Sequence, residues 1–168
     1  MSTYEQCREI YRQAFDENDA EFQNDLFNCC YKYCRCLKVG GDAVSILFAM
    51  PCITVIGNEK HKSFYLYAAA TEASNRSKGY MSRLLGDFIK EYDGSLVFLK
   101  PTAEELFSYY GKFGFDRFSS SADCNCFSYP TGGFKELTDK YGTTEKQYDG
   151  MYRFNEKIEL MNFPFITE

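Results

Sequence analysis

The order of apolar and polar segments between residues 62 and 100 restricts the fold more than any other part of the sequence. The stretch KSFYLYAAAT (62–71) is apolar along much of its length, as expected for a strand covered on both faces. After a polar loop, apolar residues recur at helical intervals from residue 81 to 89, and SLVFLK (95–100) is a second apolar strand candidate. A strand, a helix and a strand in this order predict a right-handed crossover between two parallel strands.

The N-terminal third of the chain predicts helices followed by a hairpin. Ser2 and Glu5 have capping-box spacing ahead of a first amphipathic helix, and a second helix follows. The strand candidates YCRCLKV and AVSILFAMPCITVIG flank Gly40-Gly41-Asp42, which predicts a strand–turn–strand, and Pro51 marks a bulge or an edge.

The remainder of the chain predicts a further helix and several short strands. Thr102 and Glu105 repeat the capping-box spacing ahead of a helix that ends near Gly114. FDRFSSS, CNCFSYP and MYRFNEKIEL are strand candidates, and FKELTDKYG is a short helix candidate. We therefore expect an α/β (α+β) fold, a single domain over residues 1–168, with a mixed central sheet flanked by helices.

Charge and hydropathy narrow the classes of function. The net charge is −5 with scattered Lys and Arg, so a nucleic-acid groove is not expected, because that binding depends on clustered cations. No run of about 18 apolar residues occurs, and the first residues lack the apolar core of a secretion signal, so we expect no membrane association and a cytoplasmic location. An acidic surface suits a cationic substrate such as an amine.

Eight cysteines offer a different class of function, metal binding or redox sensing. Two CxC pairs, Cys34/Cys36 and Cys124/Cys126, supply four thiols, but paired zinc ligands are usually separated by roughly two to four residues. Residues i and i+2 of a strand share a face, so each pair is also explained by packing. We predict reduced thiols and no metal site. A catalytic pair between a cysteine and the single histidine, His61, stays open without local support.

The stretch NRSKGYMSRLL (75–85) predicts an anion site at the start of a helix. The first backbone N–H groups of a helix have no intrahelical partner, and the helix dipole favours negative charge there. Gly79 allows a ligand to approach the backbone closely. The alternative is an exposed turn with solvated cations. Charge and hydroxyl donors come from the neighbours Arg76, Ser77, Lys78 and Ser82.

The same stretch resembles the acyl-CoA-binding signature of the GNAT N-acetyltransferase superfamily, Q/R-x-x-G-x-G/A, as Arg76-Ser77-Lys78-Gly79-Tyr80-Met81. A second match, YYGKFGF from Tyr109 to Phe115, resembles the family's A-x-x-F-Y-x-K-x-G-F segment. The elements between residues 62 and 118 come in the family's order, and the resemblance weakens after about residue 130. It implies an acyl-CoA N-acyltransferase fold. It also implies transfer of an acetyl group from acetyl-CoA to a primary amine of a small molecule or protein, by direct attack.

The resemblance further implies roles for individual residues. Tyr110 matches the general acid that serves the leaving thiolate, and Glu72 is a candidate base that acts directly or through water. Backbone N–H groups at the end of the strand before the signature would hold the thioester oxygen. The residues expected to bind acetyl-CoA are Ala69, Ala70, Thr71, Arg76, Ser77, Lys78, Gly79, Tyr80, Met81 and Ser82.

Alternatives remain at each of these positions. Tyr110 also lies on an apolar helix stripe, and Glu72 is equally explained as a solvated loop carboxylate. Met81 stands where the family has Gly or Ala, and Ala103 replaces a frequent Asn. These departures keep open a catalytically degenerate GNAT-fold protein that binds CoA or another ligand. Aromatic residues between 127 and 165, if exposed, could form the interface of a homodimer.

Overall fold

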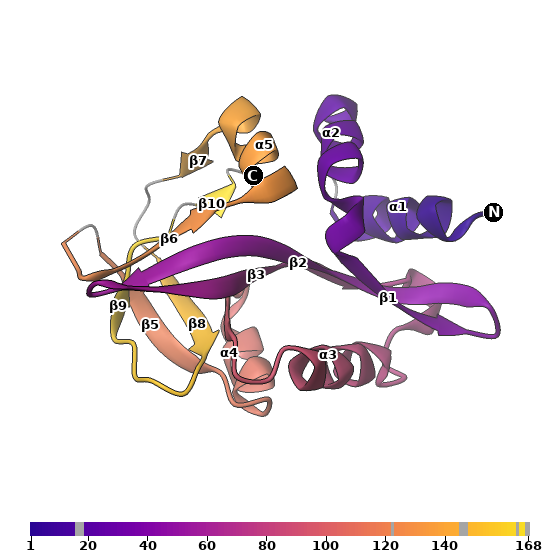
Figure 1. The fold of residues 1–168 in the computed structure, drawn as a ribbon. Coiled ribbons are helices and arrows are strands. Elements are labelled where there is room, and N and C mark those ends of the chain that lie inside the picture. Colours follow the sequence, from indigo (N-terminus) through magenta and orange to yellow (C-terminus); the bar gives the residue numbers. More distant parts are fainter. Residues whose placement is uncertain (16–18, 122, 145–147, 164, 167–168) are drawn as a thin grey trace. The chain divides into compact units, whose positions relative to one another are not determined.

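The computed structural model in Figure 1 describes residues 1–15, 19–121, 123–144, 148–163 and 165–166. The chain divides into two compact units, which are described separately. Unit 1 comprises Met1–Ala49 and Leu66–Asp93, and unit 2 comprises Met50–Tyr65 and Gly94–Glu168. Two long strands, β2 (Asp42–Ile56) and β3 (Glu59–Thr71), contribute residues to both units.

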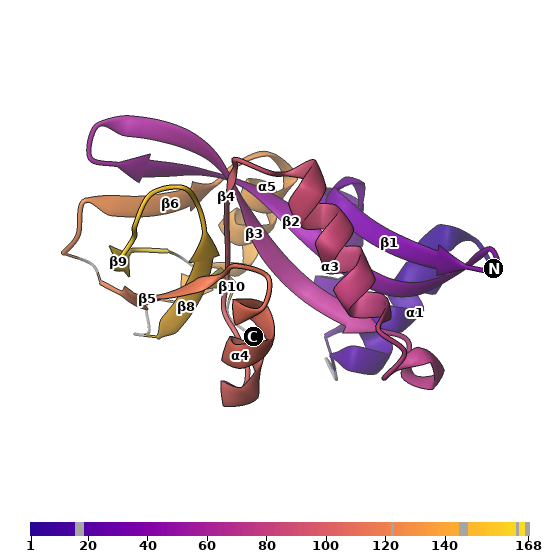
Figure 2. The same cartoon turned by 90° about the horizontal axis from the view of Figure 1, so that it is seen from below.

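Unit 1 is a three-stranded sheet with helices on both faces. Its strand order is β1-β2-β3, and β1 pairs with β2 in antiparallel fashion. Helices α1 and α2 lie on one face of these strands and α3 lies on the other, as the two views in Figures 1 and 2 show. The remaining elements of unit 1 are α1 (Thr3–Ala14), α2 (Ala20–Cys30), the 3-10 turn η1 (Tyr31–Tyr33), β1 (Cys34–Val39), the 3-10 turn η2 (Ala73–Asn75) and α3 (Tyr80–Glu91).

Aromatic side chains join the helices of unit 1 to its sheet. The ring of Phe27 in α2 meets Tyr11 of α1 and Phe48 of β2 edge-on, with centroids 5.8 and 5.6 Å apart. The buried hydroxyls of Tyr11 and Tyr67 lie 3.3 Å apart. Edge-to-face contacts of this kind stabilise a core beyond the area that the rings bury. The high aromatic content is therefore used for packing in this unit.

Unit 2 contains a mixed sheet in the order β6-β2-β3-β4-β8-β5-β9, and a separate pair of strands, β7 and β10. The pairs β3–β4 and β5–β9 are parallel, whereas β2–β6, β4–β8 and β5–β8 are antiparallel. The remaining elements of unit 2 are β4 (Leu96–Leu99), α4 (Glu104–Gly111), β5 (Asp116–Ser120), β6 (Cys126–Pro130), α5 (Gly132–Tyr141), β7 (Thr143–Thr144), β8 (Asp149–Arg153), β9 (Leu160–Met161) and β10 (Phe165–Ile166).

The core of unit 2 is centred on Tyr65, a residue of β3. Its ring stacks on Phe98 of β4 at a centroid distance of 5.6 Å. The same ring contacts Phe134 of α5 and, near the C-terminus, Phe163. These four side chains are buried. Helix α5 is therefore held against the sheet by its buried face, which carries Phe134 and Leu137, as an amphipathic helix is expected to be.

The predicted α/β fold with a mixed sheet flanked by helices is confirmed. Strands β3 and β4 are parallel, with Ser63 opposite Leu96, and α3 connects them in sequence. The capping box of α1 is present, because Glu5 N donates to Ser2 Oγ at 3.1 Å and Ser2 N donates to Glu5 Oε2 at 2.7 Å. In unit 2, Pro51, which has no N–H group, precedes the first residue of β2 that pairs with β6.

The second predicted capping box is wrong. Helix α4 has Ala103 at its N-cap, in an extended conformation, and no side chain caps it. The helix thus begins one residue too late for Thr102 to act as the cap. Glu104 and Glu105 in the first turn instead place negative charge near the positive end of the helix dipole. Within the described residues, no helix has both the length and the apolar character needed to cross a membrane.

One close contact in unit 2 gives a stability prediction. Gly150 of β8 lies opposite Phe118 of β5, whose ring is buried, and a Cβ at Gly150 would overlap that ring. We expect Gly150→Ala to lower the free energy of unfolding by about 1–3 kcal/mol, because a packed ring cannot move away cheaply. Urea denaturation measures this change.

The matched control is Gly86→Ala in α3, where an added Cβ meets no atom within 4 Å. This change should leave stability unchanged or raise it by up to about 1 kcal/mol, since glycine is unfavourable inside a helix. Equal effects of the two substitutions would contradict the packing argument.

Candidate functional site

The predicted anion site lies in unit 1, in the turn between η2 and α3 (Figure 2). Helix α3 begins at Tyr80, and its N-cap is Gly79 with φ 79° and ψ 10°, without a side-chain hydrogen bond to the helix. Ser77 also has a positive φ, 64°. Residues with left-handed conformation in a turn direct successive backbone N–H groups into one concavity, which suits an anion.

The space at Gly79 is open. A Cβ built there meets no atom within 4 Å, other than those of its two chain neighbours. The conformation itself, with φ 79°, is one that glycine adopts far more readily than other residues. Arg76, Ser77 and Lys78 are exposed beside it. The residues present therefore fit a phosphate-type anion held by backbone N–H groups and two cations.

Met81 does not fill this space. Its side chain stays more than 4 Å from a Cβ at Gly79. Met81 is half-buried and lies three and four residues before Leu84 and Leu85, both buried, so it shares their face of α3. The long side chain at this position thus extends the apolar face of the helix.

Glu72 orders the loop that leads to the turn. Its Oε2 accepts hydrogen bonds from Ser74 N at 3.1 Å, Ser74 Oγ at 2.5 Å and Asn75 Nδ2 at 2.6 Å. Asn75 Oδ1 in turn accepts from Lys78 Nζ at 3.4 Å. The hydrogen bonds from Ser74, and then from Asn75, lower the pKa of Glu72. A chain of contacts therefore joins Glu72 to Lys78, whereas its role as a general base stays a prediction.

The end of β3 is irregular where the oxyanion donors are predicted. Ala68 has φ 54°, which is uncommon for a residue other than glycine. The parallel pairing with β4 covers Ser63 to Tyr65, and Ala69, Ala70 and Thr71 lie beyond it. Thr71 Oγ1 lies 2.8 Å from Ser45 Oγ, and Thr71 O accepts from Arg76 Nε at 3.3 Å. The structure thus brings the predicted strand end and the predicted turn together in unit 1.

Tyr110 belongs to α4 in unit 2. Its side chain is only 8% exposed and packs edge-on against Tyr109 and Phe115, at centroid distances of 5.3 and 5.9 Å. Burial, with a smaller contribution from Tyr109, raises the pKa of Tyr110 to about 12. The phenol is therefore protonated at neutral pH and able to donate a hydrogen bond. Packing of Tyr110 is observed, and its role as an acid stays a prediction.

Two groupings were not found from the sequence. Cys7 contacts Cys34 and Cys36, so the first CxC pair meets a cysteine from α1. The hydrogen bond from Cys34 is the largest cause of the lowered pKa of Cys7.

The second feature that the sequence did not predict is a groove of about 660 Å³ in unit 2, lined by β5, β8 and the segment after β8. None of the predicted site residues lines this groove.

Comparison with solved structures found proteins of the same fold. A probable N-acyltransferase from Enterococcus faecalis has a TM-score of 0.58 at 15% identity, over 69% of this chain and 32% of that chain. The chain therefore spans about a third of that protein. A histone acetyltransferase HPA2-related protein from Corynebacterium glutamicum has a TM-score of 0.59 at 14% identity, over 92% of both chains. Arabidopsis thaliana Naa50 has a TM-score of 0.52 at 15% identity, over 89% of this chain and 91% of that chain.

Identities this low establish the fold and nothing finer. No curated protein sequence matched the chain. Residues 1–118, which include β3, the turn at Gly79, α3 and α4, match the family described as acetyltransferase (GNAT) domain. Because this match covers more than half of the sequence, the chain belongs to the GNAT acetyltransferase family.

Proposed function

We propose that the protein is an N-acetyltransferase that moves an acetyl group from acetyl-CoA to a primary amine of a small molecule or protein. The observation that carries the proposal is the open N-cap of α3 at Gly79, within the part of the chain that matches the family. The similar fold of Arabidopsis Naa50, which was solved with the bisubstrate analogue CoA-Ac-MVNAL, supports a CoA-based donor. A single domain, a cytoplasmic location and a homodimer are parts of the proposal that rest on the sequence alone.

The turn before α3 would hold the diphosphate of the donor. The first N–H groups of α3 and the side chains of Arg76 and Lys78 supply hydrogen bonds and positive charge to it. Ser77 and Gly79 shape the turn through their positive φ angles. When bound, acetyl-CoA supplies an activated acetyl thioester. Backbone N–H groups between Ala69 and Thr71 would donate to its oxygen as negative charge develops there.

Tyr110 would stabilise the leaving sulfur. Its raised pKa of about 12 keeps the phenol protonated at the pH of the reaction, so it can serve the leaving thiolate as a proton donor. The phenol donates a hydrogen bond to the developing thiolate, and the proton that the attacking amine loses balances the reaction. Glu72 is the candidate base that receives this amine proton, directly or through water.

The test is release of free thiol from acetyl-CoA over a panel of small amines and peptide N-termini. The proposal expects amine-dependent release that saturates with acetyl-CoA. Stabilisation by CoA without thiol release on any amine would support the alternative, a degenerate family member that binds CoA without turnover. If acetyl-CoA does not stabilise the protein and no thiol is released on any amine, both functions are contradicted.

Glu72→Ala separates its two candidate roles. Because the carboxylate holds Ser74 and Asn75, we expect the KM for acetyl-CoA to rise by about tenfold, with kcat changed by less than about threefold. A general base would instead lower kcat by about 10²-fold or more. Steady-state kinetics measure both constants. Glu72→Gln is the control, since its amide oxygen still accepts from Ser74 and Asn75, and it should restore the KM if the role is loop order.

A further inference from the structure

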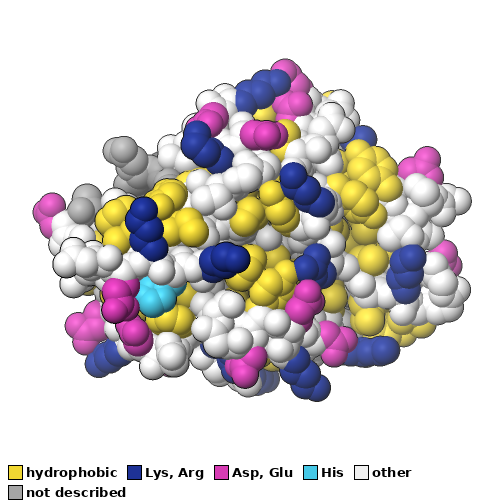
Figure 3. Space-filling view, in the orientation of Figure 1, with side chains coloured by type: hydrophobic (Ala, Val, Ile, Leu, Met, Phe, Trp, Pro, Cys, Tyr) yellow, Lys and Arg dark blue, Asp and Glu magenta, His cyan; other side chains and the backbone are white. Residues whose placement is uncertain are grey.

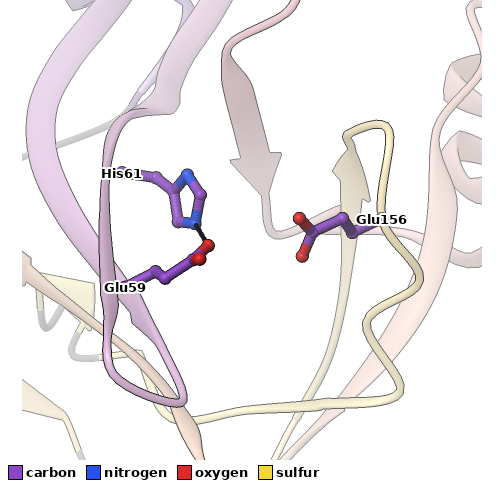
Figure 4. A group of neighbouring side chains, drawn as sticks. All are labelled: Glu59, His61 and Glu156. Atoms are coloured by element: carbon purple, nitrogen blue, oxygen red, sulfur yellow. Dashed lines mark ion pairs between the residues drawn. The ribbon is translucent and has the colours of Figure 1, made fainter.

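We propose that Glu59, His61 and Glu156 form a binding site for a divalent transition-metal ion, best matched by Zn²⁺. Glu59 and His61 lie two residues apart on β3, so their side chains share one face of the strand. Glu156 comes from the segment that joins β8 to β9. Figure 4 shows its carboxylate directed toward the pair on β3. All three residues belong to unit 2, whereas the turn at Gly79 belongs to unit 1.

The three side chains are spaced for a common ligand. One potential ligand atom from each lies within 4.8 Å of the other two. Such atoms all fit within about 2.8 Å of one central point, whereas Zn²⁺ ligands bind at about 2.0 to 2.2 Å. A movement of less than about 1 Å by each side chain closes the site. Glu59, with a side chain that is 76% exposed, has the freedom to make it.

A buried nitrogen of His61 that lacks a hydrogen-bond partner points independently to a ligand. Within the described parts of the chain, His61 Nε2 is buried and has no hydrogen-bond partner. The nearest carboxylate oxygen, Glu59 Oε2, is 3.6 Å away, beyond the usual range of about 2.7–3.2 Å for such a bond. Buried polar atoms are nearly always satisfied. An ion between the imidazole and the carboxylates would satisfy this one.

The ring of His61 is held in place while part of it stays accessible. Phe154, two residues before Glu156, packs edge-on against the imidazole at 5.4 Å. Figure 3 shows the histidine at the surface beside acidic side chains, so an ion from solvent can reach it. The same segment therefore supplies both the contact that orients the imidazole and the third carboxylate.

The ligand set selects the class of ion. Imidazole favours Zn²⁺, Ni²⁺ or Cu²⁺ over Mg²⁺ and Ca²⁺, which prefer all-oxygen sites. Two carboxylates balance the charge of a divalent cation, and three protein ligands leave a position for water. Bound metal would tie the segment after β8 to β3. Since Glu156 also lines the groove of unit 2, the ion would fix one wall of that groove.

The chain contains one histidine, which makes the test specific. The eight cysteine thiols are also potential zinc ligands, so total zinc content does not identify the site. The imidazole resonances of His61 in a ¹H–¹³C NMR spectrum report on this site alone. Titration of the reduced full chain with ZnCl₂ should shift them in a saturable manner. Glu156→Gln should raise the Kd from this titration at least about tenfold, because it removes one ligand.

Glu159→Gln is the matched control, because Glu159 lies on the same segment, is exposed and pairs with Lys157 outside the three ligands. It should leave the Kd unchanged. Saturation in the wild type with a selective loss in Glu156→Gln supports the site. The proposal is overturned if the His61 resonances do not respond to zinc, or if they respond equally in Glu156→Gln. The wild-type titration decides the first point even if a variant fails to fold.

Discussion

Gly79→Glu should abolish stabilisation of the protein by acetyl-CoA while the fold remains intact. The substitution places a negative side chain in the open space before α3, where the diphosphate is proposed to bind. A carboxylate there also opposes the ligand's charge at a distance where repulsion is strong. We expect the Kd to rise at least about 100-fold, which corresponds to about 2.7 kcal/mol. Thermal shift with and without acetyl-CoA measures it.

Gly79→Asn is the control that separates strain from charge. Asparagine tolerates the left-handed conformation better than most residues, so it retains the φ of 79° at modest cost. The variant should bind acetyl-CoA more tightly than Gly79→Glu, and both should unfold cooperatively without ligand. If Gly79→Glu is stabilised by acetyl-CoA as much as the wild type is, the turn before α3 is not the donor site.

Tyr110→Phe should lower kcat by about 10²-fold or more and leave the affinity for acetyl-CoA within about threefold. The change removes the hydroxyl proposed to donate to the leaving sulfur, while the ring keeps its contacts with Tyr109 and Phe115. Because the pKa of Tyr110 is raised to about 12, its hydroxyl stays protonated across the assay range. Ionisation of Tyr110 should therefore not lower the wild-type rate between pH 8 and about 10. The wild type and Tyr110→Phe should show the same pH dependence in this range.

Tyr109→Phe is the matched control, since it deletes the neighbouring hydroxyl on the same helix. We expect less than about a threefold change in the kcat of Tyr109→Phe, because the proposed mechanism gives the Tyr109 hydroxyl no role. Unchanged turnover in Tyr110→Phe would assign Tyr110 to packing alone. Equal losses in both variants would indicate a general effect of α4 on the fold, which thermal unfolding of the two proteins would reveal.

The sequence predicted features that depend on neighbouring residues. The capping box of Ser2 and Glu5 is a contact over three residues, and it is present. The helix start at Gly79 follows from one left-handed residue before an apolar stripe, and α3 begins at Tyr80. The second capping box failed, because the extended conformation of Ala103 sets the start of α4 and no short pattern signals it.

The remaining features depend on contacts between distant segments. Met81 was ambiguous because a sequence does not say on which face of a helix its side chain finds room; the structure keeps it away from Gly79. Cys7 was treated apart from the CxC pairs, and only the packing of α1 beside β1 brings it to Cys34 and Cys36. Glu72 was a candidate base, and its hydrogen bonds to Ser74 and Asn75 appear only once the loop is folded.

The sequence alone determined the membership of the chain in its family, the parallel pairing of β3 with β4 and the start of α3 after Gly79. Periodicity and backbone conformation over a few residues encode these features. Only the tertiary structure decided which polar groups meet across segments. Glu156 is 95 residues from His61, and the pairing of β4 with both β3 and β8 places their segments near each other. No local pattern records such a meeting, because the sheet order that produces it is set by the packing of the whole unit.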